Sequence, residues 1–364
     1  MFVEKNSLNW FGRYLDHVDI RYFDYSASGF SFVLKGKSAC ATIVSDSKNW
    51  NNQNKGVIAV FVSDGENLTW KNFPLEPQKR IILTEDENKC ILFESEDEKI
   101  VSIWVVKLSE DAFGYAGLKS LEVEGTIVEN NAHELAGREN PKIEVIGDSI
   151  TCGYGIEGVW EKDVFSTEIE RADKSYAFLT AKALNANVHF CSWSGIGIIS
   201  NYVDPQTAKN PETSWLMPLN WPYTDKSLSL RLGIEPEVWD ESRYSPDIVI
   251  IHLGTNDASW VQNKEDRRLA YVSGLRQLIE AVHRRSPKAK ICCCLGVMGQ
   301  DLCKAMEEAL SLFHKDFPKV PVKYVEFPVQ KDEDGIAADW HPSAKTHQKM
   351  ADILSKELKI LLDE

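Results

Sequence analysis

The feature that most constrains this chain is an apolar run that stops abruptly at a polar turn. Residues 143–146 are apolar except for one glutamate, and Gly147-Asp148-Ser149 follows them directly. Such a run predicts a buried strand that presents a serine hydroxyl where it ends. Open α/β sheets bind their ligands at the carboxyl ends of the strands. The segment therefore predicts an α/β sheet with a functional edge at Ser149.

From residue 142 onward, strand-like runs alternate with helical patterns. Apolar runs that predict strands cover 188–191, 247–253, 290–297 and 320–327, and stretches that predict helices cover 174–184, 264–284, 301–314 and 342–362. This alternation is typical of a doubly wound, mostly parallel sheet with helices on both faces. One long irregular insertion, 200–245, interrupts it. A structureless stretch of that length is more often a functional loop than filler.

The first third of the chain has a different pattern. Short runs of β-branched and aromatic residues lie at 29–34, 57–62, 80–83, 90–93 and 99–108, separated by polar turn clusters. This spacing, without a convincing helical stretch, predicts an antiparallel β-sandwich. We therefore expect a sandwich domain over residues 1–128, a polar linker over 129–141 and a catalytic α/β domain over 142–364.

Charge and cysteine usage restrict the partners. The net charge of −14 disfavours a nucleic-acid surface and an anionic membrane surface. The amino terminus lacks the continuous apolar core of a secretory signal, so we expect a cytoplasmic protein. Eight cysteines without paired C-x-x-C spacing indicate reduced thiols and no bound metal. Cys292-Cys293-Cys294 lie in one predicted strand, where neighbours point to opposite faces, so we expect core filling. A homo-oligomer is compatible with the sequence.

Four polar segments lie at the ends of predicted strands or just before the last helix, and in a doubly wound sheet they meet at one edge. A serine nucleophile there needs a base, for which His341 is the best-placed histidine. The oxyanion needs oriented donors, and the candidates are the backbone N–H groups of Ser149 and Gly195 and the amide of Asn256. Asp339 is the carboxylate nearest to His341 in the sequence and a candidate to orient its ring.

These segments resemble the SGNH (GDSL-type) hydrolases. The matching blocks are Gly-Asp-Ser-Ile-Thr at 147–151, Ser-Gly at 194–195, Gly-Thr-Asn-Asp at 254–257 and His-Pro at 341–342. Preceded by a sandwich, they look like carbohydrate esterase family 2, deacetylases of xylan, glucomannan and related sugars with an amino-terminal jelly roll. The resemblance implies that Ser149 is the nucleophile, His341 the base, and Gly195 and Asn256 parts of the oxyanion hole. It also implies an acetyl-serine intermediate and no cofactor.

The sequence departs from the wider superfamily just before the histidine. The superfamily places its acid three residues before the histidine, where this chain has Ala338, whereas Asp339 lies two before. Two alternatives follow. Asp339 holds the imidazole and completes a triad, or a backbone carbonyl does so and leaves a Ser–His dyad. We favour Asp339, because a base needs a partner that fixes its orientation.

Tryptophans near the catalytic blocks are candidates for binding a saccharide, because indole rings pack on the flat C–H faces of sugars. The candidates are Trp160, Trp193, Trp260, Trp340 and, in the insertion, Trp215. We expect an acetylated xylo- or manno-type oligosaccharide as the substrate. Two alternatives are an SGNH esterase or lipase acting on other small acyl or lipid esters, and a carbohydrate-binding protein with secondary esterase activity.

Overall fold

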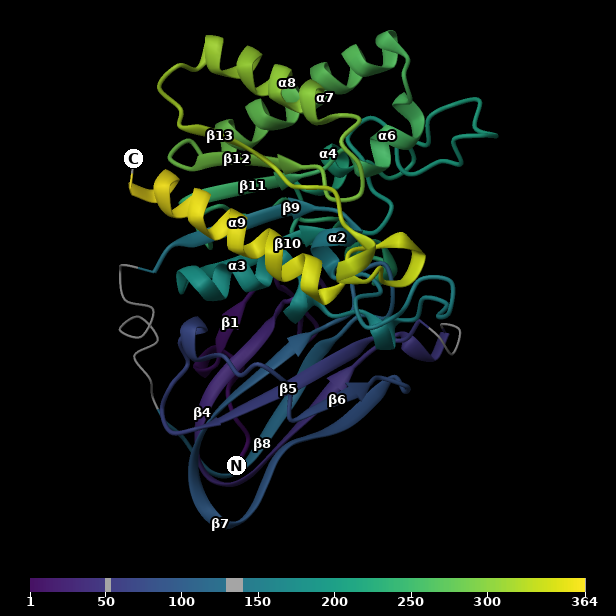
Figure 1. Ribbon diagram of the computed structural model, residues 1–364. Coiled ribbons are helices and arrows are strands. Elements are labelled where there is room, and N and C mark those ends of the chain that lie inside the picture. Colours follow the sequence, from purple (N-terminus) through teal and green to yellow (C-terminus); the bar gives the residue numbers. More distant parts are fainter. Residues whose placement is uncertain (50–53, 129–139, 364) are drawn as a thin grey trace.

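The computed structural model describes residues 1–49, 54–128 and 140–363, whose strands form an antiparallel and a parallel sheet (Figure 1). The antiparallel sheet has the order β2-β3-β8-β4-β7-β5-β6, with β1 beside β4. Its strands are β1 Asn9–Phe11, β2 Leu15–His17, β3 Ile20–Tyr22, β4 Gly29–Val44, β5 Val57–Asp64, β6 Lys79–Ile82, β7 Glu87–Lys107 and β8 Gly117–Val128. The predicted linker lies almost entirely at 129–139, outside the described residues.

This first sheet curls around a core of its own. Strand β5 shows how: Ile58 and Val60 belong to that inner core, whereas Ala59 and Phe61 face the second sheet and its helices. Side chains of a strand alternate between its faces, so one sheet can serve two cores. The antiparallel β domain is confirmed, with all its strands hydrogen-bonded into one curled sheet. A jelly-roll strand order stays a prediction.

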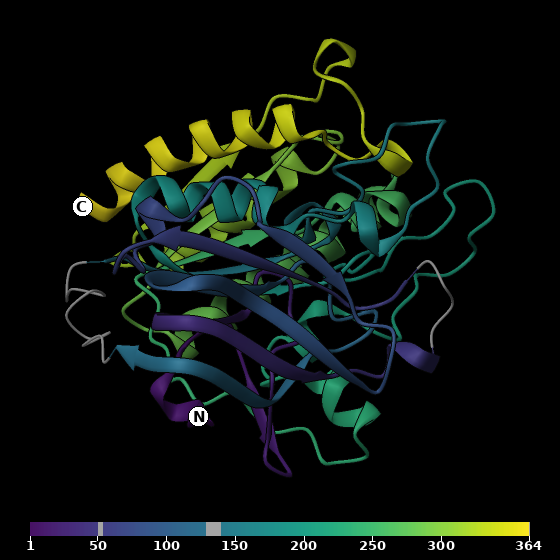
Figure 2. The ribbon, with the colours of Figure 1, turned by 90° about the horizontal axis from the view of Figure 1, so that it is seen from below.

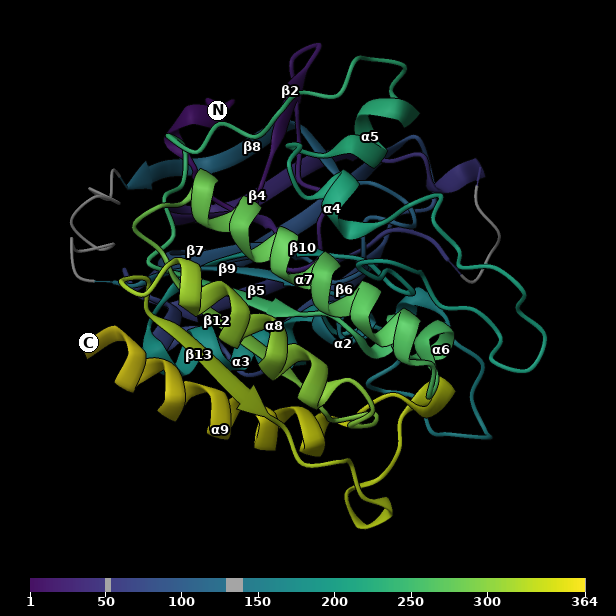
Figure 3. The same ribbon diagram turned by 90° about the horizontal axis from the view of Figure 1, so that it is seen from above.

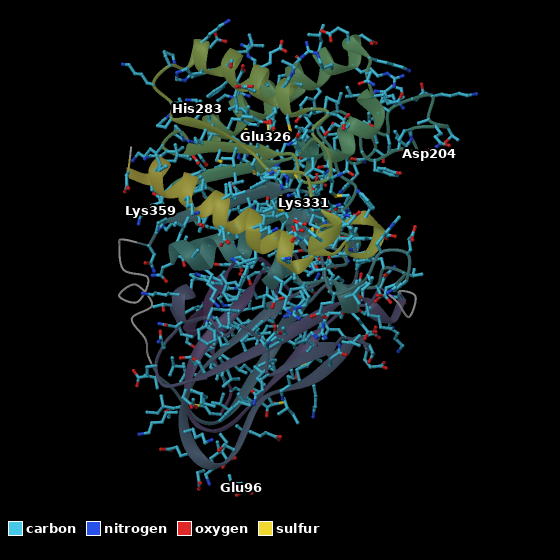
Figure 4. All side chains as sticks on the ribbon, in the orientation of Figure 1. Glu96, Asp204, His283, Glu326, Lys331 and Lys359 are labelled. Atoms are coloured by element: carbon cyan, nitrogen blue, oxygen red, sulfur yellow. The ribbon has the colours of Figure 1, made fainter. Side chains whose placement is uncertain are left out.

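The prediction of separate strands at 90–93 and 99–108 was wrong, because both belong to the 21-residue β7. The polar residues between them reach the far tip of the sheet, where Glu96 lies (Figure 4). Solvated side chains on both faces erase the apolar pattern there, although the backbone stays extended. Shifts in the β4–β7 register near Gly36 and Ala39 accompany the bend.

The second sheet is parallel throughout, with the order β10-β9-β11-β12-β13. Its strands are β9 Lys142–Gly147, β10 Asn187–Ser192, β11 Ile248–His252, β12 Lys290–Leu295 and β13 Val322–Glu326. The helices are α2 Ser149–Cys152, α3 Tyr176–Leu184, α4 Met217–Asn220, α5 Lys226–Arg231, α6 Thr255–Val261, α7 Glu265–Arg285, α8 Cys303–Asp316 and α9 Ala344–Asp363. This confirms the predicted mixed α/β fold.

Helices cover both faces of the parallel sheet. α7 and α8 lie on one face, as the view from above shows (Figure 3), and α3 and α9 lie on the other. In β12, Cys292 and Cys294 pack toward α3 and α9, and Cys293 packs toward α7 and α8. The cysteine trio is therefore core filling, as predicted. Within the described residues, no helix is long and apolar enough to cross a membrane.

The two sheets share an apolar interface. Helix α3 lies between them, and the view from below shows the curled sheet running across it (Figures 1 and 2). Phe178 of α3 packs edge-on against Trp70 and Phe73, with ring centroids 5.4 and 5.0 Å apart. A buried ion pair, Arg13 to Glu144 at 2.6 Å, also crosses the interface. The curled sheet is therefore built into the base of the catalytic part.

The insertion at 200–245 is not structureless, which corrects the prediction. It contains the short helices α4 and α5, and Leu228 of α5 packs on Leu15 and Tyr22 of the curled sheet. Its outer loop carries Asp204, at the edge of the molecule in Figure 4. Arg13 donates to the backbone carbonyl of Trp221 at 2.6 Å. Part of the insertion thus fastens the two sheets together.

Candidate active site

Ser149 lies at the point where the sequence placed it, directly after β9. It is the first residue of α2, and the carboxylate of Asp148 caps that helix by accepting from the N–H of Ile150 at 3.0 Å. The Ser149 Oγ lies 2.8 Å from Nε2 of His341. The two residues are separated by 192 positions in the chain. The fold therefore forms the nucleophile–base pair that acyl transfer requires.

The other ring nitrogen of His341 faces backbone carbonyls. Nδ1 lies 3.1 Å from the carbonyl oxygen of Asp339 and 3.3 Å from that of Ala338. A carbonyl oxygen only accepts, so Nδ1 carries the hydrogen and Nε2 offers its lone pair to the serine hydroxyl. Burial lowers the pKa of His341 to about 4, although both carbonyls act in the opposite direction. The imidazole is therefore neutral, as a base must be.

The expectation that the carboxylate of Asp339 orients the base is contradicted. This carboxylate accepts a hydrogen bond from the hydroxyl of Tyr154 at 2.9 Å, and the Asp339 backbone carbonyl serves the ring instead. The physical reason is the backbone: Asp339 and Trp340 have φ of +50° and +63°. These left-handed residues aim the carbonyl at the imidazole and turn the side chain away. The structure thus has the Ser–His dyad, the second alternative.

Tyr154 contacts both Asp339 and His341, and the sequence reasoning missed it. Its ring lies over His341 with centroids 4.3 Å apart, and its other neighbour is Phe165, stacked at 3.7 Å. The available signal was an aromatic residue between two glycines just after the nucleophile. Gly155 is required there, because its φ is +62° and a Cβ would lie 2.9 Å from that of Ala338. Tyr154 thereby links the serine loop to the histidine.

The predicted oxyanion donors Gly195 and Asn256 come from the segments that follow β10 and β11, the two strands that flank β9. The segment 193–200, which we call the oxyanion loop, is tied to the end of β9 by the N–H of Trp193, which donates to the carbonyl of Gly147 at 3.3 Å. Gly195 has φ of +77°. Asn256 is the second residue of α6, and its Nδ2 donates to the carbonyl of Ile196 at 2.8 Å. An amide has two N–H groups, so one stays available to an oxyanion.

Asp257 anchors the far half of the oxyanion loop. Its carboxylate is fully buried and accepts from the backbone N–H groups of Ile198, Ile199 and Ser200, at 3.0, 2.7 and 3.1 Å. Burial raises the pKa of Asp257 to about 6, and these hydrogen bonds act against the rise. Asp257 stands in the first turn of α6.

Glu110, a second residue that the sequence reasoning missed, comes from the first domain. Its carboxylate is buried and accepts from the backbone N–H of Ser194 at 2.6 Å. No pattern in the sequence points to this contact, because the two residues lie 84 positions apart. A single glutamate that follows a predicted strand belongs to no recognisable sequence motif.

The five candidate tryptophans form two pairs and one single residue. Trp160 and Trp340 meet edge to face at 5.7 Å beside the base, and 37% and 44% of their surfaces are exposed. Trp193 and Trp215 meet at 5.2 Å on the oxyanion side, half-buried against the core under α7. Trp260 packs with the Arg267 guanidinium, 3.4 Å from its ring centroid. Exposure beside the base favours Trp160 and Trp340 as saccharide contacts.

Two groups of buried residues have the side chains and spacing to hold a metal ion among the described residues. They are Asp24, Asp111 and Asp225, and Glu110, Cys152 and Glu170. Cations of the chain already lie at the aspartate group: Lys107 pairs with Asp24 at 3.0 Å, and Arg231 lies 3.9 Å from Asp111. Burial raises the pKa of Asp111 and Glu170. We assign the aspartate group to charge compensation at the domain interface, and Glu110 of the second group accepts from the N–H of Ser194.

Comparison with known proteins places this geometry in context. The model of the GDSL-like lipase/acylhydrolase family matches residues 145–349. The chain is 39% identical over 222 residues to the cellulase/esterase CelE of Acetivibrio thermocellus, which covers 60% of this chain but 25% of that protein. The chain thus spans about a quarter of that relative's length. It is also 28% identical over 288 residues to an acetylxylan esterase/glucomannan deacetylase of Cellvibrio japonicus, covering 79% of this chain and 74% of the relative.

A solved structure extends the likeness over both sheets. The structure of a family two carbohydrate esterase from Clostridium thermocellum in complex with cellohexaose aligns with a TM-score of 0.78 and 29% identity. The alignment covers 98% of this chain and 99% of that one. The pairing of a curled antiparallel sheet with a parallel α/β sheet is therefore shared along the whole length.

Proposed function

The chain belongs to the GDSL-like lipase/acylhydrolase family, and from that premise we propose that it is a serine esterase that removes O-acetyl groups from xylo- or manno-type saccharides. The observation that carries the proposal is the 2.8 Å contact between Ser149 Oγ and His341 Nε2. The names of the relatives, a cellulase/esterase and an acetylxylan esterase/glucomannan deacetylase, support the choice of substrate.

The reaction follows from the positions of the groups. Ser149 Oγ attacks the acetyl carbonyl carbon while Nε2 of His341 takes the hydroxyl proton. The carbonyl oxygen becomes an oxyanion that the N–H groups of Ser149, Gly195 and Asn256 stabilise. The sugar oxygen leaves with the proton from His341, and acetyl-Ser149 remains. Water then attacks this ester through the same base, and acetate and free serine result.

The exposed pair Trp160–Trp340 gives the saccharide a surface next to the base. The two rings meet at an interplanar angle of 79°, and both residues remain exposed, so part of each side chain is accessible to a sugar. Because Trp340 directly precedes His341 in the chain, a sugar stacked on it would carry its acetyl ester near the serine. This arrangement supports a saccharide leaving group over a free lipid.

Acetate release from acetylated xylo- and manno-oligosaccharides tests the proposal directly. We expect release by the wild type and none above background by Ser149→Ala. Aryl esters of increasing acyl length separate the alternative: activity on four-carbon and longer esters that rivals acetyl would indicate a general acyl or lipid esterase. Saccharide binding by both proteins without acetate release would indicate a carbohydrate-binding protein instead.

We also propose that the protein acts in the cytoplasm on short imported oligosaccharides. All eight cysteines are free thiols, and thiols persist in the reducing cytosol. Cell fractionation with an antibody against the native protein tests this. Recovery of the protein from the medium or the cell surface would overturn it.

A further inference from the structure

Glu110 reaches from the first domain into the catalytic one. It follows β7 in the chain, yet its Oε2 accepts from the N–H of Ser194 at 2.6 Å. Ser194 directly precedes Gly195, the predicted oxyanion donor. The side chain is fully buried, so water does not compete for this hydrogen bond. Burial raises the pKa of Glu110, and the hydrogen bond from Ser194 acts against the rise.

The loop that presents Glu110 is itself fixed. The ammonium group of Lys107 donates to the backbone carbonyls of Ser109 and Glu110 at 3.1 and 2.9 Å. Lys107 is also paired with Asp24 at 3.0 Å, and both side chains are fully buried. The N–H of Glu110 donates to a carboxylate oxygen of Glu170 at 3.2 Å. The carboxylate of Glu110 is therefore held on a rigid support.

The hydrogen bond from Ser194 to Glu110 lies next to Gly195, the residue of the oxyanion loop that carries the predicted donor. The carbonyl of Gly195 accepts from the N–H of Tyr202 at 2.8 Å, and the residue before it is held by Glu110. The Gly195 N–H lies between these two fixed points. Asp257 anchors residues 198–200, beyond the donor. Glycine with φ of +77° has wide conformational freedom, so its direction depends on these neighbours.

We propose that Glu110 is a positioning residue for the reaction: its carboxylate holds Ser194 so that the Gly195 N–H is aimed at the acetyl oxyanion. The inference rests on the proposed esterase function. It gives the curled sheet a part in catalysis through one acceptor atom. The position of that acceptor matters, and its charge is secondary.

Three substitutions at Glu110 separate acceptor position from charge. Gln keeps an oxygen at the same distance along the side chain, Asp keeps the charge but withdraws it by one carbon, and Ala removes both. We expect kcat for 4-nitrophenyl acetate to fall about 100-fold in Glu110→Ala, as for a catalytic group displaced by about 1 Å. Glu110→Asp falls similarly, Glu110→Gln stays close to the wild type, and KM changes little throughout.

Glu76 supplies a matched control at the same interface. Its carboxylate pairs across the domains with Lys174 at 2.9 Å and Arg171 at 3.2 Å, and it does not contact the oxyanion loop. We expect Glu76→Ala and Glu76→Gln to keep the wild-type kcat. Inactivation by a 4-nitrophenyl methylphosphonate ester, whose phosphoryl oxygen occupies the oxyanion position, should slow in parallel with kcat in the Glu110 series alone.

The outcomes separate this inference from the proposed function. If the wild type hydrolyses the ester and Ser149→Ala does not, the proposed esterase function stands, whatever the Glu110 variants show. If the wild type does not hydrolyse the ester, the proposed function itself is wrong. Wild-type kcat in a folded Glu110→Ala, or activity retained by Asp and lost by Gln, overturns the positioning role. If the alanine variant does not fold, the ranking of Gln against Asp decides.

Discussion

The two segments that meet at Ser149 are held in opposite ways. The oxyanion loop is held by two buried carboxylates that lie outside it, those of Glu110 and Asp257. They accept hydrogen bonds from four of its backbone N–H groups, at residue 194 and at residues 198–200. The histidine turn, 337–341, is shaped by its own backbone, with left-handed residues at Asp339 and Trp340. The carboxylate on that turn binds Tyr154 and leaves the base to two carbonyls.

The difference teaches where charge acts in this site. Carboxylates hold the loop that carries the Gly195 donor, but they do so through the N–H groups of other residues, Ser194 and residues 198–200. Burial lowers the pKa of the base to about 4, because a desolvated ring disfavours the imidazolium form, and the two backbone carbonyls at Nδ1 offset this only in part. The oxyanion loop is thus anchored by residues distant in the sequence, and the histidine turn by its own backbone geometry. We therefore expect substitutions in the two segments to differ in their effects on turnover and stability.

The largest effect on turnover is expected on the oxyanion side, at Asn256. Asn256→Ala should lower kcat about 10²- to 10³-fold with little change in KM, because it removes a donor that acts in the transition state. Steady-state kinetics with 4-nitrophenyl acetate measure this, with the exposed Asn72→Ala as a control for an asparagine elsewhere. A fall of less than tenfold would show that Asn256 only supports the loop through Ile196.

The second effect is on stability, at the anchor of the same loop. Asp257→Ala leaves three backbone N–H groups without their acceptor, so we expect the free energy of unfolding to drop by about 3 kcal/mol or more. Urea denaturation followed by circular dichroism measures it. The exposed Asp240→Ala should be unchanged. Equal stability of the two variants would mean that water replaces the carboxylate without cost.

The pH profile tests the histidine side. With its pKa lowered to about 4 by burial, His341 stays deprotonated down to that pH, so kcat/KM should hold from about pH 8 to 5 and fall by half near 4. A histidine of ordinary pKa would leave about 30-fold less free base at pH 5. Initial rates of acetate release, measured across one buffer series, give kcat/KM as a function of pH, and circular dichroism at each pH shows whether the protein is folded. A midpoint between 6 and 7 would contradict the dyad environment described above.

A smaller effect is expected at Asp339. Asparagine adopts the left-handed conformation readily and can still accept from Tyr154, so Asp339→Asn should keep kcat within about tenfold. In a triad the same change costs about 10⁴-fold. The comparison with Asp339→Ala isolates the contribution of the turn, since alanine lacks the acceptor and disfavours this φ. A loss above a thousandfold in Asp339→Asn would restore the triad.

The smallest expected effect is on substrate affinity, at Trp340 of the histidine turn and at Trp215, which packs on Trp193 of the oxyanion loop. Trp340→Ala removes an exposed ring beside the base and should raise KM for an acetylated oligosaccharide about 3- to 10-fold, with 4-nitrophenyl acetate unaffected. Trp215→Ala, on the half-buried pair behind the oxyanion loop, should affect both substrates alike. An identical response of the two variants would remove the distinction between a sugar surface and packing.

Much of the fold and part of the site followed from local patterns. The strand at 188–191 and the helix at 264–284 were placed within a residue or so of β10 and α7, because apolar periodicity reports burial directly. The long β7 was missed because its polar tip is solvated on both faces. Glu110 was missed for another reason: a contact between domains leaves no trace in the sequence around either partner.

The sequence by itself determined the α/β alternation and the order of the four polar blocks, because each depends on residues next to one another in the chain. It also determined that Ser149 stands at the end of a buried strand. Only the tertiary structure decided what surrounds that serine. It turned Asp339 away from His341 through two left-handed residues and brought Glu110 to Ser194 from another domain. Backbone direction and long-range proximity arise when the chain packs, and they decide which of several carboxylates meets which partner.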